Sequence, residues 1–221
     1  MNKKVIKQYL EYLELTGIRD IFFEHKPNFS IDPKEVKSQK LKNLENTYKS
    51  CNKCELSKSR NKFCYGNGNP NAKLMLIGEG PGADEDRTGK VFVGRAGQLL
   101  TRMLKAIDLQ RDDVYITNIV KCRPPNNRNP LQKEKESCIP YLEEQISIIQ
   151  PKLILLLGKV AAISLLNKNN PLKKFRKTTH KYKNIKTYVS YHPAALLRNP
   201  KWKKFAWVDL QKIQIDYNNL S

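Results

Sequence analysis

Residues 73–82 read KLMLIGEGPG, a short apolar run that ends in a turn rich in glycine. A near-continuous apolar run of this length is typical of a strand that is buried on both faces, as in a parallel sheet. Three further runs have the same character: residues 114–120 (VYITNIV), 152–158 (KLILLLG) and 186–191 (KTYVSY). We therefore expect a central sheet of four parallel strands.

Segments with apolar residues at helical spacing separate these runs, at residues 97–107, 132–149 and 160–167. Strands that alternate with helices imply right-handed crossovers and a three-layer α/β/α sandwich, which is the predicted fold class. Ligands bind such sheets at the carboxyl ends of the strands. The loops that follow the four strands are therefore the places to look for a site.

The N-terminal part of the chain has a different pattern. Residues 5–25 carry apolar side chains at helical spacing and predict an amphipathic helix or a helix pair. Residues 26–45, which contain prolines and many lysines, predict a linker that leads into a helix around residues 40–50. We therefore expect a helical N-terminal extension and linker, residues 1–47, followed by a compact domain, residues 48–221.

The charge balance points to a polyanionic partner. The 221 residues include 41 Lys and Arg against 21 Asp and Glu, a formal net charge of +20. A domain this basic favours DNA or RNA, although an AT-biased genome also enriches lysine. No run reaches the roughly 18 apolar residues of a membrane span, and the N-terminus lacks a signal-peptide pattern. We expect a monomeric, cytoplasmic protein of bacterial type with no membrane partner.

Four of the five cysteines form a candidate metal or cluster site. Cys51 and Cys54 make a C-x2-C pair, whereas Cys122 and Cys138 lie far downstream. In a reducing compartment cysteines serve as ligands or free thiols, and four thiolates complete either a tetrahedral zinc site or a cubane iron–sulfur cluster. The spacing leaves both open, and the distant pair could instead be small buried apolar residues. We expect Cys64 to be of that buried kind.

Candidate base-binding residues follow three of the strands. The GEGPG turn at residues 78–82 lets the backbone approach a flat ligand closely. Phe92 either stacks on a base or belongs to the core. Asn118 carries an amide that matches O4 and N3–H of uracil, but an Asn can equally cap a loop. His192 starts the loop after the last strand, where it is either structural or catalytic.

Two further segments could contact a nucleic acid backbone. Residues 121–130 (KCRPPNNRNP) mix cations, amides and prolines, as in a phosphate-contacting loop or a solvated surface loop. We expect Leu196 and Leu197 to be exposed, where they could fill the stack that a flipped base leaves. Arg198 would then contact a phosphate. Otherwise the two leucines begin a buried helix.

Together these motifs resemble the uracil-DNA glycosylase superfamily, specifically its family 4 iron–sulfur members. The resemblance covers roughly residues 48–214. Its motifs are GEGPG (78–82), VFVGRAGQLL (91–100), YITNIVKCRPP (115–125) and YHPAALLRNP (191–200). It implies a monofunctional uracil-DNA glycosylase of base excision repair, which flips uracil out of single- or double-stranded DNA and hydrolyses its N-glycosidic bond to leave an abasic site.

The resemblance also implies a role for each site residue. The family's ligands of a [4Fe-4S] cluster fall on Cys51, Cys54, Cys122 and Cys138, which favours this cluster over zinc. The residues implied to form the uracil pocket are Gly78, Glu79, Gly80, Phe92, Asn118 and His192. Phe92 would stack on the ring, Asn118 would read its edge, and His192 would bond to O2.

His192 and Glu79 are the expected catalytic residues. A donor at O2 gains strength as negative charge develops there, and a site that bonds the uracil edge rejects cytosine. Superfamily members with GQDPYH place an Asp where this chain has Gly80, so Glu79, Asn127 or substrate phosphates would act on the water or the cation. Glu79 is also the candidate that excludes the thymine methyl. The residues expected to contact DNA are Asn127, Leu196, Leu197 and Arg198.

Other functions fit parts of the sequence. A non-enzymatic iron–sulfur or zinc DNA-binding module explains the charge and the cysteines, but it leaves the GEGPG turn, Asn118 and the HPAALLRNP segment unexplained. A glycosylase with broader specificity, for example toward hypoxanthine, has the same fold. A cluster-based electron carrier rarely needs such a charge. A lyase needs a lysine placed for a Schiff base, and the covalent branch uses a loop histidine that residues 124–131 lack.

Overall fold

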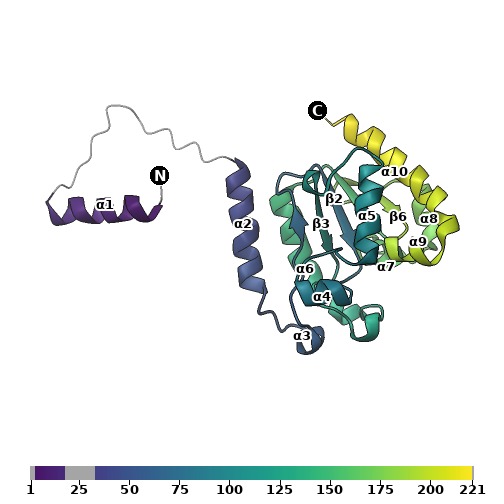
Figure 1. The fold of residues 1–221 in the computed structure, drawn as a ribbon, viewed down its shortest axis with the longest axis horizontal. Coiled ribbons are helices and arrows are strands. Elements are labelled where there is room, and N and C mark those ends of the chain that lie inside the picture. The colour runs from purple at the N-terminus through teal and green to yellow at the C-terminus, as the bar shows by residue number, and fades with distance from the viewer. Residues whose placement is uncertain (1–2, 18–32, 221) are drawn as a thin grey trace. The chain divides into compact units, whose positions relative to one another are not determined.

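The computed structural model describes residues 3–17 and 33–220, and the chain divides into two units, Met1–Asp32 and Pro33–Ser221. In the first unit, α1 (Lys3–Leu15) is the helix expected within residues 5–25 (Figure 1). The rest of that prediction lies outside the described residues. In the second unit, α2 (Pro33–Tyr48) begins well before the expected helix at residues 40–50.

Helix α2 is part of the compact unit and does not belong to an extension that ends at residue 47. Its Leu41 is buried in the core, and the Lys37 ammonium donates a hydrogen bond of 2.8 Å to the Ile149 carbonyl. At the end of the helix, the Tyr48 hydroxyl donates to Glu144 at 2.8 Å. The packing of α2 was not predicted, because most of its side chains are polar and only a few of them face the core.

The compact unit is built on a six-stranded sheet of order β1-β3-β2-β4-β6-β5 (Figure 1). The strands are β1 (Asn67–Gly68), β2 (Leu74–Gly78), β3 (Val114–Asn118), β4 (Leu153–Leu157), β5 (His180–Tyr182) and β6 (Ile185–Ser190). The four central strands pair in parallel, as predicted. The expected strand number was too small, because β1 and β5 are short antiparallel edge strands that carry no apolar run.

The three-layer prediction is confirmed. Alternate side chains of β2 enter two cores, with Leu74 and Leu76 on one face and Met75 and Ile77 on the other. Helices α5, α9 and α10 cover the first face, and α2, α6, α7 and α8 cover the second. Since both faces are covered, the strands are apolar throughout.

The helices and short helical turns of the compact unit not yet given are α3 (Leu56–Ser59), α4 (Ala83–Thr88), α5 (Arg95–Lys105), η1 (Arg111–Asp113), η2 (Pro125–Asn127), α6 (Gln132–Ile149), α7 (Lys159–Leu166), α8 (Leu172–Lys177), α9 (Pro193–Arg198), η3 (Pro200–Trp202) and α10 (Lys203–Asn218). Helices α5, α6 and α7 match the three predicted segments. Helix α10 was not predicted, because large apolar side chains such as Trp207 and Val208 are exposed and blur its pattern.

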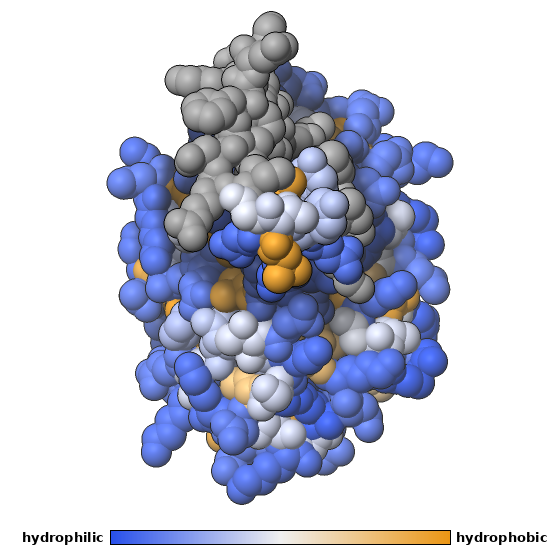
Figure 2. All heavy atoms as spheres, turned by 90° about the vertical axis from the view of Figure 1, so that its left-hand side faces the viewer, coloured by the Kyte–Doolittle hydropathy of each residue, from blue (hydrophilic) through white to orange (hydrophobic). Residues whose placement is uncertain are grey.

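On the face that Figure 2 shows, hydrophilic residues cover most of the surface drawn in colour, and apolar residues form small separate groups. Within the two described ranges, no helix combines the length and the apolar character needed to cross a membrane.

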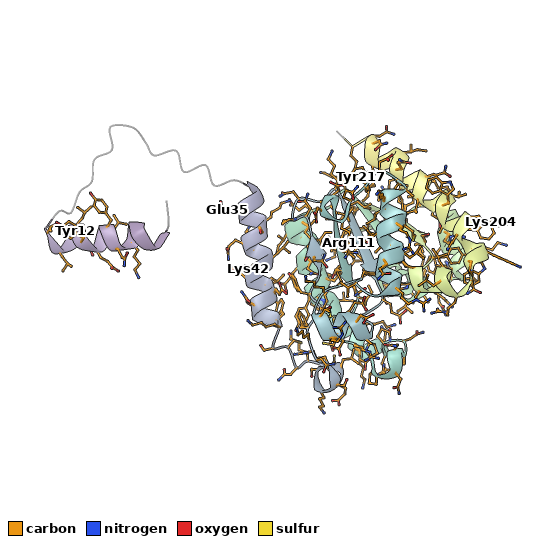
Figure 3. All side chains as sticks on the ribbon, viewed as in Figure 1. Tyr12, Glu35, Lys42, Arg111, Lys204 and Tyr217 are labelled. Atoms are coloured by element: carbon orange, nitrogen blue, oxygen red, sulfur yellow. The ribbon has the colours of Figure 1, made fainter. Side chains whose placement is uncertain are left out.

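Replacing Leu41 by Ala tests whether α2 belongs to the core. We expect Leu41→Ala to lower the free energy of unfolding by about 2–4 kcal/mol, because the change leaves a cavity in a packed core. Urea denaturation of the full chain measures this. Lys42→Ala, on the same helix and exposed (Figure 3), is the control and should change stability by less than about 0.5 kcal/mol. Equal stabilities of the two variants would contradict the packing of α2.

Candidate active site

The carboxyl ends of the central strands open into a pocket of about 370 Å³, within the roughly 300–1,000 Å³ usual for small-molecule sites. Residues predicted from the sequence that line it are Glu79, Gly80, Phe92, Asn118, Asn127, His192 and Arg198. Further lining residues, for which the sequence predicted no individual role, are Glu85, Ala96 and Ala194, together with Arg128 and Asn129 of the expected phosphate-contacting loop. Segments that are far apart in the sequence therefore meet at this edge of the sheet.

Gly78 lies behind the pocket wall and allows two of its side chains to meet. It is the last residue of β2 and pairs in register with Asn118, the last residue of β3. A Cβ atom on Gly78 would lie 2.6 Å from the Phe92 ring and closer still to the Asn118 amide oxygen. Because both side chains pack directly over this backbone, any residue larger than glycine would push them out of place.

Phe92 occupies a constrained turn. Its φ of 52° lies in the left-handed region, which is unusual for a bulky residue. Arg111, labelled in Figure 3, donates to the carbonyls of Phe92 at 3.2 Å and Val91 at 3.0 Å. A Cβ atom on Gly97 would lie 2.8 Å from the Phe92 Cα atom. The turn is therefore held from two sides, and the ring centroid lies 5.5 Å from that of His192.

Glu85 ties the two glycine-rich loops of the pocket together. One carboxylate oxygen accepts hydrogen bonds from the backbone N–H groups of Val93 at 2.8 Å and Gly94 at 2.9 Å, and the other accepts from Gly82 N–H at 3.1 Å. Hydrogen bonds to an ionised acceptor are stronger than neutral ones. In the sequence, the only trace of this role is a Glu three residues after Gly82, the spacing of a capping box.

Asn118 presents an unused acceptor to the pocket. The residue is only 1% exposed, and its amide oxygen has no hydrogen-bond partner among the described residues. Its own carbonyl accepts from the buried Lys121 ammonium at 2.8 Å, which fixes the end of β3. An unpaired buried acceptor costs about 1–3 kcal/mol, so a ligand that donates here recovers that cost.

His192 is held neutral, with one ring nitrogen already occupied. Protein surrounds the ring except where it opens to the pocket, and this burial lowers the imidazole pKa to about 4, with the charge of Arg198 acting in the same direction. Nδ1 accepts a hydrogen bond from the Ala194 backbone N–H at 3.2 Å. The neutral ring therefore carries its hydrogen on Nε2, which can donate to a ligand.

Glu79 is the carboxyl group nearest in sequence to the β2 end. It is partly buried, and burial raises its pKa above the ordinary value, while the charges of Lys135 and Arg198 lower it. A partly buried carboxyl beside cations can act on a water molecule within the pocket.

Asn127 is a second polar residue at the pocket. It is exposed, and its amide oxygen accepts a hydrogen bond from Arg123 at 2.9 Å.

The burial of Leu196 shows that one prediction was wrong. We expected it to be exposed, but it is only 1% exposed and packs in the core with α5 and α10. The alternative that it begins a buried helix is the one observed, since it lies in α9. Leu197 packs only partly against this core, and Arg198 is exposed where it lines the pocket.

The four candidate ligand cysteines come from three segments. Cys51 and Cys54 lie between α2 and α3, Cys122 follows β3, and Cys138 lies in α6. Burial is the main cause that raises the pKa values of Cys54, Cys122 and Cys138, to about 12 for Cys138. The charges of neighbouring cysteines add to each of these shifts, so the four thiols are close enough to influence one another.

Hydrogen-bond donors surround these sulfur atoms. The Tyr141 hydroxyl donates to Cys51 at 3.0 Å, the Arg60 guanidinium to Cys122 at 3.3 Å, and the Lys121 backbone N–H to Cys138 at 3.4 Å. In the part of the chain that the structure describes, no three His, Cys, Asp or Glu side chains converge as ligands of a single metal ion. A cubane differs from a single ion because each thiolate binds its own iron atom, so its ligands need not converge on one point. Cys64 is fully buried, as expected.

Comparison with known proteins assigns this arrangement to a family. The sequence pattern of the Uracil DNA glycosylase superfamily matches residues 65–211. The chain belongs to this superfamily. The chain is 43% identical to the type-4 uracil-DNA glycosylase of Sulfurisphaera tokodaii over 183 residues, which cover 79% of this chain and 83% of the relative.

Further type-4 uracil-DNA glycosylases are similar to this chain to the same degree. The relative from Archaeoglobus fulgidus is 42% identical over 74% of this chain and 86% of its own length. The relative from Thermotoga maritima is 42% identical over 68% of this chain and 80% of its own length. The superfamily match includes every element that contributes to the pocket, from β2 to α9.

Replacing Glu85 by Gln tests how the pocket loops are held. We expect Glu85→Gln to lower the free energy of unfolding by about 1–3 kcal/mol, because the amide group no longer offers charged acceptors on both atoms. Hydrogen exchange at the Val93 and Gly94 amides should become faster. Asp84→Asn is the matched control, since Asp84 is exposed and pairs only with Arg87 at 3.5 Å. Unchanged exchange at both amides in Glu85→Gln would refute the bridging role.

Proposed function

We propose that this chain excises uracil from DNA by hydrolysing the N-glycosidic bond, leaving an abasic site, as a monofunctional enzyme of base excision repair. Membership of the superfamily and the names of the relatives support this proposal. The observation that carries it is the amide oxygen of Asn118, which has no hydrogen-bond partner among the described residues and belongs to a residue that lines the same pocket as His192. The pocket thus offers one acceptor and one donor beside the flat face of Phe92.

The edge of uracil has a donor at N3 and an acceptor at O4. The Asn118 oxygen accepts from N3–H, and its amide nitrogen donates to O4. Cytosine has a lone pair at N3 and an amino group at C4, so both bonds would be lost. A site built for these bonds rejects such an analogue strongly, because its buried polar atoms are then left unpaired. Phe92 stacks on the ring and Gly80 lines the same wall.

Bond cleavage moves an electron pair from the C1′–N1 bond onto the base, where the negative charge is shared between N1 and O2. The His192 Nε2–H donates to O2 and strengthens as this charge develops. Because the imidazole is neutral, the leaving group is stabilised by a hydrogen bond and no proton needs to be transferred. The sugar becomes an oxocarbenium-like cation. A water oxygen then bonds to C1′, and the proton of this water passes to a general base of the protein.

Glu79 is the residue that we assign to this water. Its carboxyl group lines the pocket, and its charged form also stabilises the cation on the sugar. Asn127, on the opposite loop, is the second candidate for orienting the water. Arg198 at the pocket mouth contacts a phosphate of the DNA, and Leu197 fills the gap that the flipped base leaves.

We further propose that Cys51, Cys54, Cys122 and Cys138 hold a [4Fe-4S] cluster. Four cysteines whose charges act on one another, and donors directed at three of the sulfurs, support this assignment. When bound, the cluster supplies iron–sulfur bonds that cross-link three chain segments. Its role is structural, since it joins the Cys51 turn to the loop after β3 and to α6.

The proposed activity is tested with an end-labelled oligonucleotide that contains one uracil, followed by alkali. We expect cleavage at uracil only after alkali, no cleavage of matched strands with thymine or cytosine, and a rate lowered about 10²–10³-fold in His192→Ala, as for loss of an oxyanion donor. His180→Ala, at the distant β5 edge, is the control and should retain the rate. Because the pKa of His192 is about 4, the imidazole stays neutral between pH 8 and pH 6, and its titration should not change the rate in that range. At lower pH the rate should fall as the Glu79 carboxylate, whose pKa is raised by burial, becomes protonated.

Each rival function has its own outcome in this assay. DNA binding without cleavage would identify a binding module, and cleavage without alkali would identify a lyase. Equal release of hypoxanthine would replace uracil specificity by a broader one. A wild-type rate in His192→Ala would refute the assigned role of the imidazole.

Cluster binding is tested by iron and sulfide analysis of protein reconstituted without oxygen. We expect the wild type to bind iron and sulfide with broad visible absorbance, and Cys138→Ser to lose both together with thermal stability. Cys64→Ala is the matched control, because Cys64 is buried in the opposite core and should not affect iron content. Stoichiometric zinc without sulfide would contradict the proposed cluster.

A further inference from the structure

A second groove combines aromatic rings with cations. It is lined by Lys173, Arg176, Lys177, Tyr191, Phe205 and Lys212. These residues come from α8, the loop after β6 and α10, and the two helices meet where Arg176 pairs with Asp209 near the β6 edge of the sheet (Figure 1). Tyr191 directly precedes His192 in the chain. One residue that lines the groove and one that lines the uracil pocket are therefore neighbours in the chain.

The aromatic rings of this region are held in fixed positions while part of their surface stays exposed. Tyr191 stacks on Trp202 with ring centroids 5.0 Å apart. The Arg176 guanidinium lies 4.3 Å from the Tyr191 ring centroid and 5.7 Å from that of Phe205. Phe205 is 43% exposed and Trp202 is 37% exposed. Exposed rings fixed in this way are suited to stack on flat partners.

The groove keeps a positive charge. Asp209 is the acidic residue in its lining, and its carboxylate is already paired with Arg176 at 2.6 Å and bonded by the Ser190 hydroxyl at 2.7 Å. No salt bridge in the described part of the chain involves Lys173, Lys177 or Lys212. Lys204 on α10 also projects from the same region (Figure 3).

We propose that this groove binds the unpaired DNA strand that continues from the nucleotide in the pocket. Its bases stack on Phe205 and Trp202, and its phosphates lie along the lysines. A positive groove with exposed aromatic rings is how proteins bind single strands without reading sequence. In a duplex the bases stack on one another, so these rings add affinity only for unpaired DNA. The inference rests on the proposed function, because the pocket defines which strand enters the groove.

Phe205 tests the stacking contribution. We expect Phe205→Ala to weaken binding of a uracil-free oligothymidine by at least about fivefold, since one base stack is worth about 1–3 kcal/mol. Phe205→Tyr keeps the ring and should bind as the wild type does. Fluorescence anisotropy measures the affinity, and a fully paired duplex of equal length should show no such loss. Equal affinity of all three proteins for the single strand would overturn the proposal.

The lysines test the charge contribution separately. We expect the triple variant Lys173→Ala, Lys177→Ala and Lys212→Ala to bind the single strand at least about tenfold more weakly. The logarithm of the binding constant should also fall less steeply with the logarithm of the salt concentration. Each phosphate that a lysine no longer neutralises reduces the slope by about 0.7, so three lysines reduce it by about two. The control replaces three exposed lysines that do not line the groove, Lys105, Lys152 and Lys181, and changes the net charge equally. Equal effects of the two triple variants would contradict the proposal that the groove binds the strand.

The substrate series separates this inference from the proposed function. If the wild type releases uracil from no substrate, the proposed function fails, while binding of the uracil-free strand still tests the groove. If the wild type is active, the groove variants should lose activity only on long single strands, through a raised KM with unchanged kcat. On a uracil-containing trinucleotide, which is too short to reach the groove, they should match the wild type. Full activity of the variants on long strands would contradict the proposed role of the groove and leave the proposed function intact.

Discussion

The backbone of Phe92 lies in the left-handed region, with its Cα atom against Gly97 and its ring against Gly78. This packing gives the pocket a flat wall, because the ring lies directly over the Gly78 backbone and lines the pocket. A bulky residue in this conformation persists only when its surroundings hold it. Arg111 supplies hydrogen bonds on one side and Glu85 fixes the following residues on the other.

The two groups proposed to recognise the base, the Asn118 amide and the His192 ring, are neutral, although the chain is strongly basic. In the proposed function, the Asn118 oxygen and the His192 ring recognise the base, whereas cations such as Arg198 bind the DNA backbone and lysines line the second groove. This separation has a physical reason. A buried charge beside the base would need a partner of its own, while exposed lysines remain hydrated and attract DNA over a longer range.

The cysteine site is linked to the pocket through Lys121. Its backbone N–H donates to the Cys138 sulfur, and its buried ammonium donates to the Thr117 hydroxyl, the Asn118 carbonyl and the Gln145 amide oxygen. Three acceptors satisfy this amino group and offset part of the cost of its burial, which still lowers the pKa of Lys121 to about 7. The same residue therefore fixes the strand end that carries the recognition amide and one wall of the cysteine site, so the two sites share a rigid support.

The sequence by itself determined the parallel centre of the sheet, because strands buried on both faces must be apolar at every position. It also determined which loops carry the pocket residues, since parallel strands bring their carboxyl ends to one edge. Only the tertiary structure decided the edge strands, the place of α2 and the burial of Leu196, because these depend on contacts between distant segments and not on local pattern. Glu85 and Arg111 are positioning residues for the same reason: their partners are backbone groups, and backbone hydrogen bonding across a fold leaves no periodic trace in the sequence.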